Sequence, residues 1–359
     1  MANQELKSFE IHGYKSIKNQ KIDLGKMNVL IGQNGAGKSN FISAFRFLKN
    51  IIDKKLKVTS LKIGADNLLY YGSKETDQIY FNLDFRPNTY NITLKPTNND
   101  TLFVEFEHAG FWRKEYPSPY FDTTTMAEEE SRLSDVKKGI PRYVYDELKN
   151  WRIYHFHDTS ETAGFKKYGS LADNSFLFED AANIASFLYI MKHKFPKHYE
   201  RIIKTIQLVI PFFKDFVLEP NKLNEDLIRL EWQDIYSEKT FLPSQLSDGS
   251  LRFICMATLL LQPELPKVIL LDEPELGLHP SAITILAGLL LKASTRSQVI
   301  VSTQSVSLVN EFDSESIIVV EKQESETVFK RLDSELLESW LDEYSLGDLW
   351  DKNIIGGKP

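Results

Sequence analysis

The segment from Gly32 to Ser39 constrains the fold of this chain more than any other stretch, because its residues, GQNGAGKS, fit the pattern G-x-x-x-x-G-K-[ST]. An apolar run at 27–31 precedes it, and a segment with helical periodicity, 40–48, follows it. In a strand–turn–helix of this kind, backbone N–H groups and the helix N-terminus point at bound phosphates. The sequence therefore predicts a phosphate-binding P-loop within an α/β fold.

Individual positions of the P-loop have predicted parts in binding Mg²⁺ and ATP. Lys38 is expected to reach the β- and γ-phosphates, and the hydroxyl of Ser39 to hold Mg²⁺. The further nucleotide contacts are predicted at Asn34, Gly35, Ala36, Gly37 and Asn40. ATP and Mg²⁺ are thus the expected cofactors.

A second pattern, an apolar run at 268–271 that ends in Asp272 and Glu273, is typical of a Walker B strand. Mg²⁺·ATP needs one carboxylate near the metal, and hydrolysis benefits from a second carboxylate aimed at the attacking water. We assign the first role to Asp272 and the second to Glu273. Two acids also mark many strand ends that meet solvent, but the P-loop on the same chain favours the nucleotide interpretation.

The segment 246–252, LSDGSLR, resembles the signature motif of ABC-type ATPases. Ser-Asp-Gly is also an ordinary helix-capping sequence. Its position, about twenty residues before the Walker B strand, matches the ABC arrangement. In that family the signature of one subunit closes over ATP held by the P-loop of another. The resemblance therefore implies that Ser247 and Gly249 contact nucleotide across a head-to-tail homodimer.

Two further positions follow from the same resemblance. The segment 275–280 lies where such ATPases carry the dimer-contacting D-loop, so His279 lies either at that interface or in a simple turn before a helix with Pro280 in its first turn. Gln304 ends a buried strand where ABC-type ATPases usually have a histidine that contacts the γ-phosphate. An amide donates a hydrogen bond but cannot carry charge or accept a proton as imidazole does. Lys38, Glu273 and Gln304 are the predicted catalytic residues, with slow hydrolysis expected.

Two other polar groups have alternative interpretations. His155, His157 and Asp158 could suggest a metal site, because histidines two apart on a strand point to the same face. No third and fourth ligand to go with the two histidines is evident. We favour the interpretation that this segment replaces the Q-loop. A basic stretch covers 192–204. It is either a solvated helical face or a contact for DNA or protein.

Composition excludes some classes of protein. The chain has 359 residues, 42% hydrophobic and 26% charged, with a net charge of −7, so a wholly basic nucleic-acid-binding surface is not indicated. The single cysteine, Cys255, lies in an apolar stretch, which fits a reducing compartment. No signal-peptide pattern and no apolar run near the ~20 residues of a membrane span occurs, so a cytoplasmic protein without a membrane partner is expected.

The periodicity predicts three units. Residues 1–160 form an N-terminal ATPase lobe with the P-loop and an antiparallel sheet; 161–235 form a helical insertion and a strand pair; 236–359 form a C-terminal ATPase lobe. Strands are predicted within 66–107, helices within 178–216, and a long loop with short helices over 114–147. Alternating strands and helices over 246–321 predict a mostly parallel core sheet.

The chain resembles the RecF/SMC-like branch of ABC ATPases, and within it bacterial AAA-type ATPases related to the overcoming-lysogenisation-defect (OLD) family. The segments that carry this resemblance are 13–17, 31–40, 154–160, 246–249, 272–280, 345–350 and 356–359. It implies an ABC-type P-loop ATPase, of a kind that often works in anti-phage defence, where ATP-dependent assembly controls an effector. OLD proteins carry a C-terminal Toprim nuclease domain, for which this chain has no room. A nuclease effector is therefore expected to be a separate polypeptide.

Three functions stay open at this point. The first is an ATPase that dimerises on ATP and senses or regulates a separate effector in phage defence. The second is a DNA repair or recombination ATPase that clamps DNA. The third is a non-catalytic scaffold with a structural nucleotide, which Gln304 in place of histidine keeps open.

Overall fold

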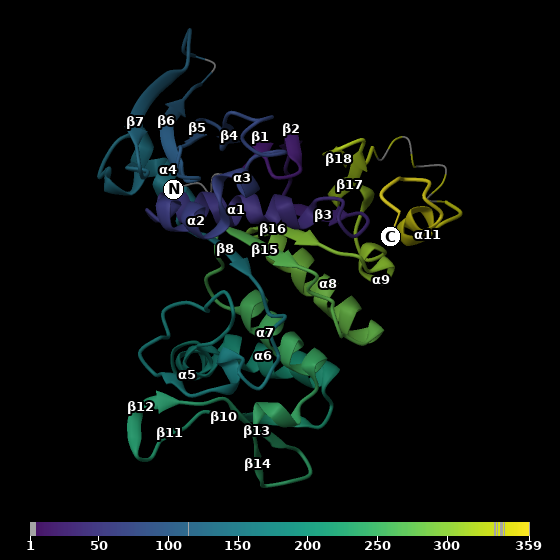
Figure 1. Cartoon of the computed structure of the whole chain (residues 1–359). Coiled ribbons are helices and arrows are strands. Elements are labelled where there is room, and N and C mark those ends of the chain that lie inside the picture. The colour runs from purple at the N-terminus through teal and green to yellow at the C-terminus, as the bar shows by residue number, and fades with distance from the viewer. Residues whose placement is uncertain are drawn as a thin grey trace.

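The computed structural model describes residues 5–113, 115–333, 335, 337, 340 and 342–358. Two six-stranded sheets and a helical lobe make up this part of the chain (Figure 1). Within the described residues, no helix is both long and apolar enough to span a bilayer.

The core sheet has the strand order β18-β17-β3-β16-β15-β8, and all neighbouring pairs except β17–β18 are parallel. Its strands are β3 (Met27–Ile31), β8 (Trp151–Tyr154), β15 (Val268–Asp272), β16 (Gln298–Ser302), β17 (Ile317–Gln323) and β18 (Glu326–Arg331). Every residue of β3 and β16 is buried, because both faces of the sheet are covered. Leu30 belongs to one apolar core, and its neighbours Val29 and Ile31 belong to the other. The predicted mostly parallel sheet is confirmed.

The second sheet is antiparallel, in the order β2-β1-β4-β5-β6-β7. Its strands are β1 (Ser8–Tyr14), β2 (Ile17–Asp23), β4 (Ile79–Asp84), β5 (Asn88–Pro96), β6 (Leu102–Phe111) and β7 (Tyr120–Glu128). Helix α1 (Lys38–Ile52) lies between the two sheets, since Phe45 packs on Phe9 at a ring-centroid distance of 5.0 Å and on Trp151 at 5.1 Å. The P-loop helix is therefore fixed by both sheets.

The prediction of a loop with short helices over 114–147 is wrong at Tyr120–Glu128, where the structure has strand β7. This strand pairs with β6 along the edge of the sheet, and most of its residues are exposed. An edge strand that buries little apolar surface has no alternating apolar pattern to reveal it. The rest of this region does contain short helices, namely η1 (Leu133–Asp135) and α4 (Ile140–Leu148), while α2 (Leu56–Ile63) and α3 (Ala65–Leu68) follow α1.

The helical lobe lies against the other face of the core sheet (Figure 1). Its main helices are α5 (Ile184–Lys194), α6 (Pro196–Val209), α7 (Asp248–Leu261) and α8 (Pro280–Ser294). The predicted helices within 178–216 are confirmed, with Pro196 in the first turn of α6. Two small sheets complete the lobe: β10 (Phe213–Val217), β13 (Glu231–Asp234) and β14 (Thr240–Phe241) in one, and β9 (Gly169–Ser170), β11 (Pro220–Asn221) and β12 (Asn224–Ile228) in the other. The remaining short elements are η2 (Gly164–Lys166), η3 (Pro243–Gln245), α9 (Val306–Val309), η4 (Ser314–Ser316) and α11 (Leu346–Asp351).

Glu107 on β6 anchors the antiparallel sheet, although its side chain is fully buried. Its carboxyl group accepts hydrogen bonds from the hydroxyls of Tyr90 at 2.7 Å, Thr124 at 2.8 Å and Ser131 at 2.5 Å, and also from Thr125. These contacts join β5, β6, β7 and the chain that follows. Burial of so polar a group is tolerated because its hydrogen bonds are made.

We expect Glu107→Leu to lower the free energy of unfolding by about 3 kcal/mol, because several buried hydroxyls would lose their acceptor. Urea denaturation followed by circular dichroism measures the loss. Glu105→Leu on the same strand is the matched control, since Glu105 makes a partly exposed ion pair with Lys95 and should cost less than about 1 kcal/mol. Equal losses for the two variants would contradict the anchoring role.

Candidate nucleotide-binding site

The P-loop joins β3 to α1, and its shape depends on glycine at two close approaches. Gly32 has φ +152°, and a Cβ there would lie 2.1 Å from the carbonyl oxygen of Val320 on β17. Gly37 has φ +118°, and a Cβ there would lie 2.2 Å from Oγ1 of Thr327 on β18. No other residue fits these positions without moving the loop away from the β17–β18 hairpin.

Hydrogen bonds from neighbouring elements hold the P-loop in place. Thr327 donates a hydrogen bond from Oγ1 to the carbonyl of Ala36 at 2.8 Å, and the same hydroxyl lies 2.7 Å from Ser16 Oγ. Asn40 Nδ2 donates to Ser16 Oγ at 2.7 Å. The turn between β1 and β2, the hairpin β17–β18 and the start of α1 are therefore tied together at the loop.

The side chain of Lys38 lies inside the loop. Its ammonium donates to the carbonyl of Gly32 and, at 3.1 Å, to that of Gln33. Burial lowers the pKa of Lys38, and the nearby carboxylates of Glu273 and Asp272 oppose that shift. A buried cation with acids around it is suited to an anionic ligand such as a phosphate chain.

The acids after β15 are each bound by a residue at the end of β16. Because parallel strands end at the same edge of the sheet, three successive residues of one strand end reach three acids of the next. These contacts are Ser302 Oγ with Asp272, Thr303 Oγ1 with Glu275, and Gln304 Nε2 with Glu273. Glu273 also has φ +42°, a strained conformation for a residue with a side chain.

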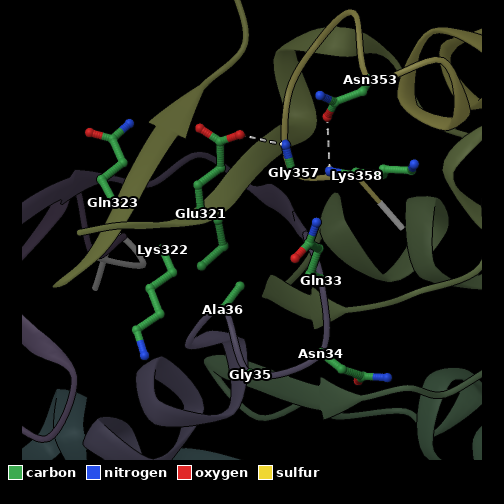
Figure 2. Close-up of a pocket in the computed structure, with 11 residues that line it drawn as sticks. Gln33, Asn34, Gly35, Ala36, Glu321, Lys322, Gln323, Asn353, Gly357 and Lys358 are labelled. Atoms are coloured by element: carbon green, nitrogen blue, oxygen red, sulfur yellow. Dashed lines mark hydrogen bonds between the residues drawn. The ribbon is translucent and has the colours of Figure 1, made fainter. Parts of the chain in front are cut away.

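The P-loop and Glu273 meet at one small cavity of about 150 Å³, whose lining does not include Asp272 or Glu275. Its lining includes Lys38, Ser39, Asn40, Glu273 and Gln304. The structure thus brings together the P-loop, the second Walker B acid and the switch residue that the sequence predicts. Asn34, Gly35 and Gly37 also line it, while Ala36 lines a neighbouring cavity (Figure 2).

The residues present fit a Mg²⁺ ion bound together with phosphates. Mg²⁺ keeps several waters and takes only one or two protein ligands in nucleotide sites. Ser39 lines the cavity. Asp272 lies near enough to Lys38 for its carboxylate to oppose the lowering of the pKa of that lysine. Among the described residues no group of three or more His, Cys, Asp or Glu side chains could hold a metal ion alone, which also leaves the metal interpretation of His155, His157 and Asp158 without support.

Glu275 is a residue of this site that the sequence did not single out. Burial raises the pKa of its carboxyl group. Oε1 accepts from Thr303 and from the backbone N–H of Gln304 at 3.4 Å, and Oε2 has no hydrogen-bond partner in the described part of the chain. The sequence signal that could have identified Glu275 is that it is a third acid, two positions after Glu273. Glu275 holds the backbone that carries Gln304.

His157 connects the Walker B strand to the helical lobe. Its Nε2 lies 2.8 Å from the carbonyl oxygen of Asp272. Arg252 on α7 donates to the carbonyl of His157 at 3.0 Å and to that of Leu276 at 2.9 Å. That this segment takes the place of a Q-loop stays a prediction.

The signature residues do not line the P-loop cavity of their own chain. Ser247 is the exposed N-cap of α7, where its hydroxyl accepts from the backbone N–H of Ser250 at 3.1 Å. A Cβ on Gly249 would lie 2.1 Å from the carbonyl oxygen of Gly277, so α7 abuts the segment after the Walker B strand. His279 is the N-cap of α8, with Pro280 in the first turn, as the simpler interpretation predicts.

The predicted basic stretch divides into engaged and free side chains. Lys192 pairs with Asp215, and His193 and His198 bond to backbone carbonyls. Lys194, Lys197, Arg201 and Lys204 are exposed, and none of the described residues forms an ion pair or side-chain hydrogen bond with them.

The fold and the site define a P-loop ATPase of the ABC type. Residues 27–310 match the family described as "AAA domain, putative AbiEii toxin, Type IV TA system". The chain belongs to this family. Membership together with the P-loop and Walker B geometry makes the protein an ATPase, which decides against the non-catalytic scaffold.

Known relatives and solved structures agree with this class. The chain is 25% identical over 307 residues to a Helicobacter pylori protein named ATP/GTP phosphatase, covering 78% of this chain and 79% of that protein. Its fold is similar to an Smc head bound to the C-winged helix domain of ScpA (TM-score 0.59, 16% identity, 93% of this chain and 99% of that chain). It is also similar to an Smc head with an extended coiled coil bound to the C-terminal domain of ScpA derived from Pyrococcus furiosus (TM-score 0.57, 15% identity, 94% and 98%). The structural likeness shows the RecF/SMC-like fold.

Proposed function

We propose that this ATPase dimerises on ATP, hydrolyses it slowly, and senses or regulates a separate effector, a nuclease, in anti-phage defence. The observation that carries the proposal is that one chain supplies only part of the site. Lys38, Glu273 and Gln304 meet at the P-loop, whereas Ser247 lies away from that cavity, is exposed and is available to another subunit, with Gly249 buried behind it against Gly277. The family description, which names a toxin of a toxin–antitoxin system, favours a protein that works with a second component.

In this proposal the P-loop N–H groups, Lys38 and Ser39 hold and orient the triphosphate. Ser39 and Asp272 would hold a Mg²⁺ ion, which would supply charge neutralisation at the phosphate oxygens. Glu273 orients the attacking water, and Gln304 donates a hydrogen bond to the γ-phosphate. In the structure the amide of Gln304 instead contacts Glu273, so ATP has to draw that amide away before the carboxylate can act.

The first prediction concerns assembly. With Mg²⁺·ATP, Glu273→Gln should form a stable dimer with twice the mass of one chain, because ATP would be held but not cleaved. In the presence of Mg²⁺·ATP, Lys38→Ala should keep the mass that it has without nucleotide, because it has lost contacts to the phosphates. Light scattering coupled to size exclusion measures both. A Glu273→Gln protein whose mass is unchanged by ATP would contradict the sandwiched dimer.

The second prediction concerns the rate. Gln304→His should raise kcat for ATP hydrolysis by about tenfold, because imidazole can exchange a proton and carry charge beside the γ-phosphate. Gln304→Ala, which keeps neither hydrogen bond nor charge, is the matched control and should lower kcat. Phosphate release under saturating ATP gives both rates. If the histidine variant is as slow as the alanine variant, Gln304 does not limit hydrolysis.

A second candidate function is a DNA repair or recombination ATPase that clamps DNA. The observation in its favour is the exposed basic stripe on α6, where Lys197, Arg201 and Lys204 follow the helical repeat on one face. Such a stripe can contact phosphates even on an acidic protein.

This candidate predicts DNA-stimulated ATP hydrolysis that falls steeply between 50 and 200 mM salt, by about a hundredfold or more in affinity. Charge reversal at Lys194 and Lys197 should abolish the stimulation. Lys62→Glu, an exposed lysine on α2, is the control and should leave it intact. Absence of any stimulation by DNA would leave the effector-regulating function.

A further inference from the structure

The solvent-facing side of helix α6 has three basic residues without a counter-ion in the described part of the chain. Lys197, Arg201 and Lys204 follow one another at intervals of four and three residues, so they lie on one face of the helix. All three are exposed, and no described residue forms an ion pair or a side-chain hydrogen bond with them. On a chain whose net charge is −7, this face is a local basic surface that is complementary to an acidic ligand.

Exposed apolar side chains lie at both ends of this basic face. Phe195, the residue before α6, is 40% exposed, and Leu208 in the last turn is 69% exposed. Leu208 lies four residues after Lys204 and so continues the same face. Beyond the helix, Phe212 is 40% exposed, and its carbonyl accepts a hydrogen bond at 2.9 Å from the backbone N–H of Ile235, whose side chain is also exposed. We call this face the α6 surface, and its members are Phe195, Lys197, Arg201, Lys204, Leu208 and Phe212.

We propose that the α6 surface binds an acidic amphipathic helix of the separate effector. Helix α6 has 14 residues and is about 21 Å long, so a partner helix of four turns covers it. Acidic side chains in the middle of that helix, three and four residues apart, pair with Lys197, Arg201 and Lys204. Apolar side chains at its ends cover Leu208 and Phe212. The inference rests on the proposed function, which requires an effector, and adds where the effector binds and by what chemistry.

The exposed apolar side chains favour a protein over DNA as the occupant of this surface. Phosphates would satisfy the bases but would leave Leu208, Phe212 and Ile235 in contact with water, because the backbone of a duplex is polar. Glu200, exposed beside Arg201, would also face the phosphates. A protein helix can place a basic residue opposite Glu200 and apolar residues opposite Leu208, and a phosphate backbone can do neither.

The opposite side of α6 fixes the α6 surface to helix α7. Tyr199, Ile202 and Ile206 of α6 are buried in the core that also contains the apolar residues of α7. His198 of α6 lies with Nδ1 2.9 Å from the carbonyl oxygen of Leu261, the last residue of α7. An effector on α6 is therefore bound next to the helix that, in the proposed dimer, presents Ser247 to the second subunit (Figure 1).

Peptide selection tests the chemistry of the occupant. A displayed library of random peptides of about 20 residues, long enough to form such a helix, is selected on the unaltered protein after counter-selection on Arg201→Glu. The expected survivors carry Asp or Glu at three- and four-residue spacing, flanked by leucine or aromatic residues. Survivors without that acidic repeat, or no survivors at all, would overturn the inference.

One surviving peptide, synthesised with a fluorescent label, is then titrated with variants and followed by anisotropy. Arg201→Glu should weaken its binding by about thirtyfold or more, because a like charge replaces an opposite one, and Leu208→Ser should weaken it by about tenfold. Lys222→Glu, an exposed lysine between β11 and β12 of the same lobe, is the matched control and should change the binding less than about twofold. A loss with Arg201→Glu but none with Leu208→Ser would overturn the inference, since charge alone would then be recognised.

A labelled DNA duplex is the competing probe. A duplex that displaces the peptide from the unaltered protein and fails to bind Arg201→Glu would assign the α6 surface to DNA and overturn the inference. A duplex that leaves the peptide bound supports the protein partner.

The proposed ATP dimer is measured independently of this surface. Arg201 does not line the P-loop cavity, so Glu273→Gln combined with Arg201→Glu should still double in mass with Mg²⁺·ATP. Loss of peptide binding to the α6 surface while that dimer forms would overturn the inference alone. A Glu273→Gln protein that does not dimerise would overturn the proposed function, whatever the peptide does.

Discussion

The structure depends on bringing one lysine and three acids to the same edge of a buried sheet. Lys38, Asp272, Glu273 and Glu275 all lie partly out of water, where an uncompensated charge is costly. The parallel order of β3, β16 and β15 solves this problem, since the donors at the end of β16 reach one acid each.

The surrounding elements hold that edge in place from several sides. The aromatic packing of α1 between the two sheets fixes the helix that follows the P-loop. The hydroxyl of Thr327 fixes the loop itself, and Gly357 packs against its first glycine. The antiparallel sheet and the C-terminal segment therefore support the P-loop and α1, even though they contribute none of the predicted catalytic side chains.

Much of the site could be predicted from the sequence, because the P-loop and the Walker B strand are local patterns whose residue order fixes their geometry. The contact of Gln304 with Glu273 was not predicted; it arises because the parallel strands β15 and β16 are neighbours and end at the same edge of the sheet. Strand β7 could not be predicted, since its side chains are mostly exposed and carry no apolar period. The packing of Gly357 on Gly32 joins opposite ends of the chain, and nothing local in either segment indicates it.

The contacts of Arg252 link the exposed Ser247 end of α7 to the turn that carries Glu273. Ser247 and Arg252 lie on the same rigid helix, α7, whose first turn abuts Gly277. Arg252 binds the carbonyls of His157 and Leu276, and His157 in turn contacts the backbone of Asp272. In the proposed dimer, a second subunit that binds nucleotide through Ser247 would act on a helix whose Arg252 contacts both His157 and Leu276. Glu273 lies between Asp272 and Leu276, the two points that these contacts reach, and its backbone conformation is strained. Any displacement of α7 on closure of that dimer would therefore bear directly on the turn that carries Glu273.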